Sequence, residues 1–285
     1  MISRRAILAA PLLAAPAFWA LRVGADDFEN AVSALERRHG GRLGIAVLDT
    51  TNGKLRAYRG DERFPLCSTF KFLAAAFVLA RVDRKEESLD RRIVYGKADL
   101  VTYSPITEKY AGEGMTVGAI CEAAVTLSDN TAGNLLFDSF GGPAGLTAYM
   151  RSLGDEMTRL DRRETALNEA APGDPRDTTT PSTMAAVLQK TLLGEALSPA
   201  SRAQLADWLV ATKTGDKRLR AGVPKGWRVG DKTGSGGNNA TNDIGVLWPP
   251  DRAPIVVAAY YVGADASDDQ RSAVLADVGR LAASA

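Results

Sequence analysis

The chain has 285 residues, a net charge of +1 and an apolar content of 45%, which suits one or two globular domains with a substantial core. Acidic and basic residues are interspersed, so the composition argues against a nucleic-acid surface and a polybasic membrane patch. One histidine, His39, and two cysteines, Cys67 and Cys121, are too few for a zinc site, and we expect neither a metal nor another cofactor.

Residues 1–25 have the layout of an export signal peptide. Arg4 and Arg5 precede an apolar run that ends at Leu21, and small residues follow at positions 23–25. A twin-arginine signal and a general secretory signal both fit, and a retained membrane anchor is the remaining alternative. In each case we expect a folded part outside the cytoplasm, periplasmic or secreted, with no stable membrane association once the signal is removed.

Hydrophobic periodicity predicts strands near both ends of the mature chain and a long helical stretch between them. Asn52-Gly53 lies between two apolar runs and predicts a hairpin. The pattern is helical from about residue 63 to residue 212, except at 160–181, which is charged and lacks a period. The predicted helices are 26–39, 68–81, 117–127, 130–140, 143–153, 181–193, 199–210 and 268–283, and the predicted strands are 43–48, 55–58, 227–232, 242–248 and 255–262.

This order of elements predicts an α/β (α+β) fold with two domains. The economical arrangement is one five-stranded antiparallel sheet flanked by the terminal helices, with an all-helical domain inserted between its second and third strands. The α/β domain would be discontinuous, formed by residues 26–60 and 212–285, and the helical domain would cover 61–211. The chemistry would then lie in the crevice between the domains.

Ser68 and Lys71 begin the most apolar predicted helix and share one face of it, because they are three residues apart. A serine hydroxyl becomes a nucleophile when a neighbour takes its proton, and a lysine in apolar surroundings can have a pKa low enough to do so. The positive end of the helix would also favour a developing anion. The alternative is a capping serine followed by a lysine whose stem lies along the core.

Three further short stretches carry polar groups at the ends of predicted elements. Each also has a plain structural interpretation, as a helix cap, a strand-to-turn transition or a solvated loop carboxylate. They are Ser128-Asp129-Asn130, Lys232-Thr233-Gly234-Ser235 and Glu164-Thr165-Ala166-Leu167-Asn168.

Taken together and in this order, the four stretches resemble those of a class A serine β-lactamase. The resemblance extends from about Asp26 to Ala285, and the stretch from Glu164 to Asn168 separates this family from penicillin-binding proteins. It implies that Ser68 attacks the carbonyl of a β-lactam and that Lys71 takes part in proton transfer. It also implies that water activated by Glu164 hydrolyses the resulting ester.

The resemblance implies roles for the remaining residues as well. Ser128 would pass a proton to the departing ring nitrogen, and the N–H groups of Ser68 and Ser235 would form the oxyanion hole. Arg162 and Asp177 resemble the ion pair that closes the loop around Glu164, and Arg220 would be structural. The substrate would be bound by Tyr103, Asn130, Asn168, Arg218, Lys232, Thr233 and Ser235.

The two cysteines depart from patterns known in the family. Family members that hydrolyse carbapenems pair a cysteine at the position of Cys67 with one after the Lys-Thr-Gly stretch, where this chain has Gly236. The partner position of Cys121 is occupied by Ala75. We therefore expect two buried free thiols, with a Cys67–Cys121 bridge as the alternative.

Two other functions share parts of this pattern. A D-alanyl-D-alanine peptidase of the penicillin-binding type would acylate but hydrolyse the drug poorly, and Glu164 and Asn168 argue against it. A β-lactam sensor domain would stay acylated and would need a membrane-spanning partner domain. We therefore predict a small-molecule hydrolase that confers β-lactam resistance, acts as a monomer, and needs neither nucleic acid nor a membrane.

Overall fold

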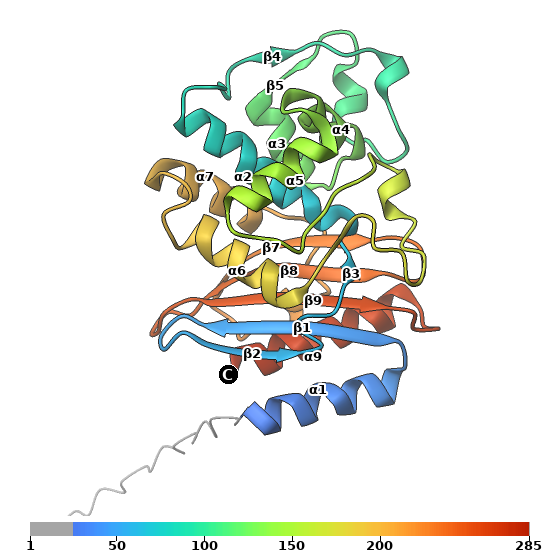
Figure 1. The fold of residues 1–285 in the computed structure, drawn as a ribbon, viewed down its shortest axis with the longest axis vertical. Helices are drawn as coiled ribbons and strands as arrows, with labels where there is room; N and C mark the ends of the chain where they lie inside the picture. Colours follow the sequence, from blue (N-terminus) through green and yellow to red (C-terminus); the bar gives the residue numbers. More distant parts are fainter. Residues whose placement is uncertain (1–24, 285) are drawn as a thin grey trace, which may run out of the picture.

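A five-stranded antiparallel sheet forms the centre of the protein (Figure 1), as the sequence predicts, and its strand order is β2-β1-β9-β8-β7. The structure is a computed structural model that describes residues 25–284, so the predicted export signal lies outside it except for Ala25. The strands are β1 Arg42–Asp49, β2 Lys54–Tyr58, β7 Arg228–Ser235, β8 Thr241–Trp248 and β9 Ile255–Val262.

Strand β9 is buried along its whole length because both faces of the sheet are covered. Its alternate residues point to opposite sides, as the pleat requires. Val257, Ala259 and Tyr261 pack in one core cluster with α1 Ala25–His39 and α9 Asp268–Ala283. On the opposite face, Val256, Ala258 and Tyr260 belong to the core of the helical part.

The helical part lies on the other side of the sheet from the terminal helices (Figure 1). Helix α2 runs through its core with nearly every residue buried, which explains its uninterrupted apolar sequence. Side chains of Thr116, Asp129, Thr180 and Ser198 cap the helices that follow them. The main helices of this part are η1 Cys67–Thr69, α2 Phe70–Asp83, α3 Val117–Thr126, α4 Asn130–Ser139, α5 Gly142–Ser152, α6 Pro181–Leu192 and α7 Pro199–Val210. The short helix α8 Leu219–Gly222 instead packs against α9.

The prediction of helical structure throughout residues 63–212 is wrong in two places. Residues 84–116 form mostly loops and short 3-10 turns, together with β4 Arg92–Ile93 and β5 Met115–Thr116, which pair with each other. In addition, β3 Phe64–Pro65 pairs with β6 Thr178–Thr179, which ties the long loop to the start of the nucleophile turn. Pairs of only two residues leave no periodic signal in a sequence.

Strand β7 extends three residues beyond its predicted end at Lys232, because Gly234 and Ser235 continue the ladder with β8. A Cβ on Gly234 would approach the carbonyl oxygen of Leu66 to 2.9 Å, so glycine lets the strand pass close to the turn that carries Ser68. Among residues 25–284, no helix is both long and apolar enough to cross a membrane.

Candidate active site

A groove of about 280 Å³ lies between the helical part and the end of β7. Lys71, Glu164 and Lys232 are the predicted site residues that do not line it, and they are buried instead. Thr214 lines it without having been predicted. The lining residues are Ser68, Tyr103, Ser128, Asn130, Asn168, Thr214, Arg218, Thr233 and Ser235.

Lys71 is fully buried and connects several parts of the site. Its Nζ donates to Ser68 Oγ at 2.7 Å, to Asn130 Oδ1 at 2.7 Å and to the carbonyl of Ser128 at 3.1 Å. It also lies 2.6 Å from Glu164 Oε1. An ammonium has three protons, so it cannot donate fully to these four oxygens at once. Lys71 is therefore placed to exchange protons with both the hydroxyl and the carboxylate.

Electrostatics favour that exchange. Burial lowers the pKa of Lys71, and the nearby Glu164 carboxylate opposes this shift. Burial, reinforced by the charge of Lys71, holds the pKa of Lys232 well below its ordinary value. Lys232 Nζ donates to Ser128 Oγ at 3.1 Å and to the carbonyl of Thr233 at 2.8 Å. Two buried lysines, one on α2 and one on β7, thus both donate to Ser128 beside the groove.

Glu164 is held in place by its own backbone and by an amide neighbour. Its N–H donates to Asn134 Oδ1 at 3.0 Å, and Asn134 Nδ2 donates to its carbonyl at 3.0 Å. Asn168 Nδ2 donates to Glu164 Oε2. Asn168 Oδ1 is buried and has no hydrogen-bond partner among the described residues, so it remains able to accept a hydrogen bond at the groove.

The turn before α4 brings two predicted site residues, Ser128 and Asn130, to the groove. Asp129 accepts from the N–H groups of Ile106 and Thr107 at 3.0 and 2.9 Å, and it also caps α4 through Ala132 N at 2.9 Å. Ser128 has a φ of 60°, a left-handed conformation that is uncommon for serine and concentrates at functional sites. The sequence shows the cap but not this conformation.

Two other site segments share this backbone geometry. Cys67, directly before Ser68, has a φ of 44°, and Tyr103 has a φ of 65°. The carbonyl of Tyr103 accepts from Asn130 N at 3.0 Å, which fixes the loop against α4. The Tyr103 side chain is 55% exposed and stands at the mouth of the groove.

Arg218 acts on the end of β7 rather than facing the groove freely. Its guanidinium donates to the carbonyls of Gly234 and Asn242 at 3.0 and 2.8 Å, and to Ser235 Oγ at 2.8 Å. Arg220 pairs with the buried Asp231, as expected for a structural residue. Arg218 therefore lines the groove while its guanidinium also fixes the Ser235 hydroxyl.

The loop that carries Glu164 is closed at its base by the pair expected from the sequence. Arg162 Nε lies 2.6 Å from Asp177 Oδ2, and Asp177 Oδ1 accepts from the N–H groups of Asp161 and Arg162. On its far side, Gly237 N donates to the carbonyl of Asn168 at 2.8 Å. The loop is thus attached both to its own base and to the turn after β7.

Sequence reasoning missed Asn134 and Thr214. Asn134 is a buried amide inside α4. A polar residue on the apolar side of a predicted helix was the sequence feature that could have indicated a buried hydrogen-bonding role. Thr214 Oγ1 lies 2.6 Å from Thr233 Oγ1, a contact that only the fold creates. Cys67 and Cys121 are both buried free thiols. Among residues 25–284, no group of three or more histidine, cysteine or acidic side chains could hold a metal ion.

Comparisons with known proteins agree with this geometry. The family model described as "Beta-lactamase enzyme family" matches residues 27–285. Beta-lactamase L2 of Stenotrophomonas maltophilia is 51% identical over 96% of this chain and 92% of its own length. The carbapenem-hydrolysing β-lactamase KPC of Klebsiella oxytoca is also 51% identical, over 87% of this chain and 85% of its own.

Solved structures give the same result. An ancestral class A β-lactamase has a TM-score of 0.88 and 68% identity, and the match covers 89% of this chain and 98% of that one. The putative class A enzyme PenP of Rhodopseudomonas palustris has a TM-score of 0.89 and 62% identity, covering 90% and 98%. The chain therefore belongs to the β-lactamase enzyme family, within its serine-dependent class A, and it is a hydrolase of β-lactams that confers resistance to them.

Proposed function

We propose that the enzyme opens penicillins and cephalosporins through an acyl-enzyme on Ser68, which water activated by Glu164 then hydrolyses. The observation that carries this proposal is the chain of contacts from Glu164 Oε1 to Lys71 Nζ, at 2.6 Å, and from Lys71 Nζ to Ser68 Oγ, at 2.7 Å. These distances suit proton transfer without an intervening group.

Acylation begins when Glu164 accepts a proton from Lys71, which leaves a neutral amine beside Ser68. As the Ser68 oxygen bonds to the lactam carbonyl carbon, its proton passes to that amine. The developing oxyanion is stabilised by the N–H groups of Ser68 and Ser235, and one such donor is typically worth about 3–4 kcal/mol. The C–N bond of the ring then breaks.

The departing nitrogen takes its proton from the hydroxyl of Ser128. That hydroxyl accepts a hydrogen bond from Lys232, so its own proton is free to point toward the substrate. Lys71 replaces the proton that Ser128 has given up, and Glu164 returns its proton to Lys71. Glu164 is then a carboxylate again and can act as the base of the second step.

Deacylation uses Glu164 together with Asn168. The carboxylate takes a proton from a water molecule, and the hydroxide attacks the ester carbonyl. As the ester C–O bond breaks, Glu164 returns this proton through Lys71 to the Ser68 oxygen, which restores the free hydroxyl and the Glu164 carboxylate. Asn168 Oδ1, which has no partner among residues 25–284, supports a role in orienting that water. Asn134 acts through Glu164 by holding its backbone on both sides.

Substrate is held by its carboxylate and by its side-chain amide. The carboxylate would lie at the end of β7 against Thr233 and Ser235, where an anion also favours the charged form of Lys232. Arg218 orients the Ser235 hydroxyl toward it. Asn130 would bind the side-chain amide of the substrate, and Tyr103 would form one wall.

The proposed substrates are penicillins and cephalosporins, and the cysteine pattern gives no support for adding carbapenems to them. One relative is named for that activity, and in the resemblance it depends on a bridge from the position of Cys67. Here Cys67 is a free thiol and faces Gly236, where a Cβ would approach its sulfur to 2.7 Å. A panel containing a penicillin, a cephalosporin and a carbapenem, assayed side by side, tests this restriction.

Replacing Glu164 separates the two chemical steps. We expect Glu164→Ala to accumulate one covalent acyl group per protein, visible by intact mass, and to turn over a chromogenic cephalosporin at least 100-fold more slowly. Glu156→Ala removes a carboxylate that is 78% exposed outside the groove, and it should behave like the wild type. Normal turnover by Glu164→Ala would refute the assignment.

Export and assembly complete the proposal. We propose that residues 1–25 direct the chain to the periplasm or the medium and are removed there, and that the mature enzyme is a monomer. The mass of the protein recovered from each cell fraction measures the cleavage, and light scattering measures the assembly. Full-length protein in the cytoplasm, or a stable dimer, would contradict the respective part.

A further inference from the structure

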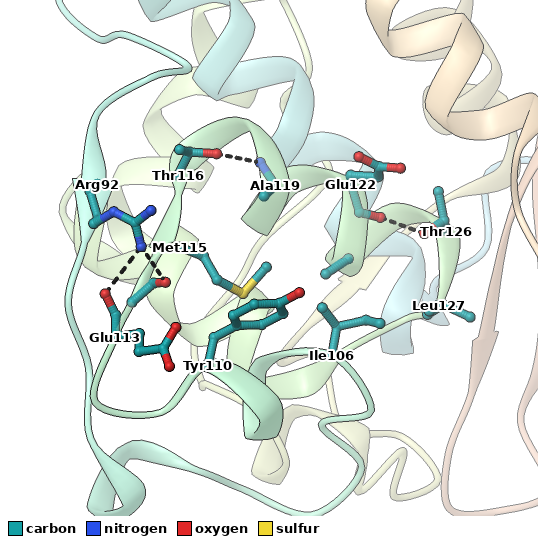
Figure 2. A pocket seen from close by; sticks show the side chains of 12 residues that line it. Arg92, Ile106, Tyr110, Glu113, Met115, Thr116, Ala119, Glu122, Thr126 and Leu127 are labelled. Carbon is teal, nitrogen blue, oxygen red and sulfur yellow. Dashed lines mark hydrogen bonds between the residues drawn. The ribbon is translucent and has the colours of Figure 1, made fainter.

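A second cavity, of about 400 Å³, lies in the helical part and shares no lining residue with the catalytic groove (Figure 2). It is lined by α3, by the β4–β5 pair, by Ile106 and by the 3-10 turn η3 Thr107–Tyr110 that follows Ile106. Its volume is within the range of small-molecule sites in proteins. Its lining includes Arg92, Ile106, Tyr110, Glu113, Met115 and Glu122, together with Ala119, Ala123 and Leu127.

Apolar groups form most of the interior of this cavity. Met115 and Ala123 are nearly fully buried, and Ile106 and Leu127 are partly buried. Figure 2 shows Met115 and Ile106 on either side of the Tyr110 ring. Tyr110 is 43% exposed, so part of its ring is accessible to a ligand. This interior suits the aromatic or aliphatic body of a ligand.

The charged groups of the cavity are mainly acidic. Glu113 and Glu122 are exposed, and within residues 25–284 neither carboxylate makes a hydrogen bond or an ion pair. The one basic group, Arg92, already donates to the carbonyls of Glu113 and Gly114 at 3.1 and 2.7 Å. The cavity thus offers two unpaired carboxylates, and Figure 2 shows that of Glu113 beside Tyr110 and that of Glu122 farther from the ring.

We propose that this cavity binds a small amphiphilic cation, a molecule with one ammonium group on an aromatic or branched aliphatic body. The body would displace water from Met115 and Ile106, and each buried CH₂ contributes about 0.8 kcal/mol. The ammonium would lie against the Tyr110 ring, within reach of Glu113 or Glu122. An anionic ligand such as a β-lactam carboxylate would be repelled, so this site selects the opposite charge from the groove.

The cavity wall is bonded directly to the catalytic turn. Ile106, which lines the cavity, and the adjacent Thr107 both donate their N–H groups to Asp129. Leu127, also in the wall, immediately precedes Ser128. A ligand that separates η3 from α3 would therefore shift the turn that carries the Ser128 hydroxyl. Linkage requires that ligand binding in this cavity and substrate binding in the groove change each other's affinity by the same factor.

Binding can be measured without reference to activity. The probe is 4-phenylbutylammonium, with 4-phenylbutanol and 4-phenylbutyrate as neutral and anionic controls, followed through methyl resonances of Ile106, Met115, Ala119 and Leu127. We expect saturable shifts, an affinity for the ammonium at least fivefold higher than for the alcohol, and the weakest binding for the carboxylate. Equal affinities for all three probes, or no saturable shift, would overturn the proposal.

Three variants locate the site. Ala119→Phe fills the cavity and should abolish binding, whereas Glu122→Gln should keep binding but reduce the preference for the ammonium at least twofold. Glu108→Gln changes an exposed glutamate of η3 that does not line the cavity, and it should bind like the wild type. An unchanged affinity in both Ala119→Phe and Glu122→Gln would refute the assignment.

The rate of cephalosporin hydrolysis measures the coupling between the cavity and the turn that carries Ser128. At saturating 4-phenylbutylammonium we expect cephalosporin hydrolysis to fall at least twofold, and added substrate should not restore it. Restoration by substrate, together with undiminished inhibition in Ala119→Phe, would place the probe in the catalytic groove and refute a separate site. Methyl shifts with an unchanged rate would refute the link to Ser128.

Discussion

Asp177 is a buried carboxylate that closes the base of the loop carrying Glu164, so its isosteric replacement tests whether loop closure positions Glu164. Its Oδ1 accepts from two backbone N–H groups at 2.7 and 2.9 Å, and its Oδ2 lies 2.6 Å from Arg162 Nε. In Asp177→Asn the amide oxygen can accept either the two backbone N–H groups or the Arg162 guanidinium, but not both. The amide nitrogen must then face an N–H donor on the other side.

The cost follows from that mismatch. A hydrogen bond to a charged group contributes about 1.5–3 kcal/mol, and Arg162 keeps Glu169 as a second partner, so we take about 2 kcal/mol for loop closure. At 1.4 kcal/mol per factor of ten, this lowers the closing equilibrium constant about 30-fold. We expect turnover to fall about tenfold to thirtyfold, with acyl-enzyme accumulating because deacylation needs the closed loop.

Asp138→Asn is the matched control. Asp138 makes a two-point ion pair with Arg163, next to Glu164, but both side chains are largely exposed, at 59% and 44%. Exposed pairs contribute at most about 1 kcal/mol, so turnover should change less than about fivefold. Intact mass during turnover and amide exchange over 161–177 measure the two effects. If Asp177→Asn resembled Asp138→Asn in both assays, loop closure would not position the deacylating group.

Two further predictions follow from buried titratable groups. Burial raises the pKa of Cys67 to about 12 and also raises the pKa of Cys121, so both thiols should resist a thiol reagent at pH 8 and react fully after unfolding; two fast thiols in folded protein would contradict this. Burial, with the neighbouring Asp231, raises the pKa of Asp243 well above its ordinary value. The native state then binds more protons than the unfolded state above about pH 4, so this group destabilises the protein as pH rises. Urea unfolding at several pH values measures the difference between the free energies of unfolding of Asp243→Asn and the wild type. This difference should grow in favour of Asp243→Asn by about 1.4 kcal/mol per pH unit between about pH 4 and the native pKa of Asp243. Parallel pH profiles for the two proteins would refute this.

Elements governed by local chemistry were predictable from the sequence. Pro199–Val210 and Asp268–Ala283 have the boundaries expected from their periodicity, because Ser198 and Ser267 cap them at the residue before each begins. The hairpin at Asn52-Gly53 forms for the same reason, since Gly53 adopts a φ of 71° that glycine tolerates. In each case the determining contacts lie within a few residues along the chain.

Features that depend on distant partners were not predictable. The order of strands places β9 between β1 and β8, a choice set by which faces the helices bury rather than by any short pattern. Asn134 is explained only once the loop containing Glu164 lies against α4. Residues 84–116 contain apolar residues at helical spacing but are held as loops by long-range bonds, such as Gly112 N to the carbonyl of Tyr95. Tertiary contacts override propensity in such segments.

The charge balance around the nucleophile explains why an anionic substrate suits this site. Burial lowers the pKa values of both Lys71 and Lys232, but Glu164 compensates only the first. Toward the groove, Lys232 donates to the neutral oxygens of Ser128 and Thr233. A carboxylate arriving beside Thr233 supplies the opposite charge that Lys232 lacks there, and the interaction is strong because the amine is already desolvated. In the proposed mechanism the substrate carboxylate would thus do more than anchor the ligand. It would favour the protonated Lys232 that donates to the Ser128 hydroxyl, and so prepare that hydroxyl to protonate the leaving nitrogen.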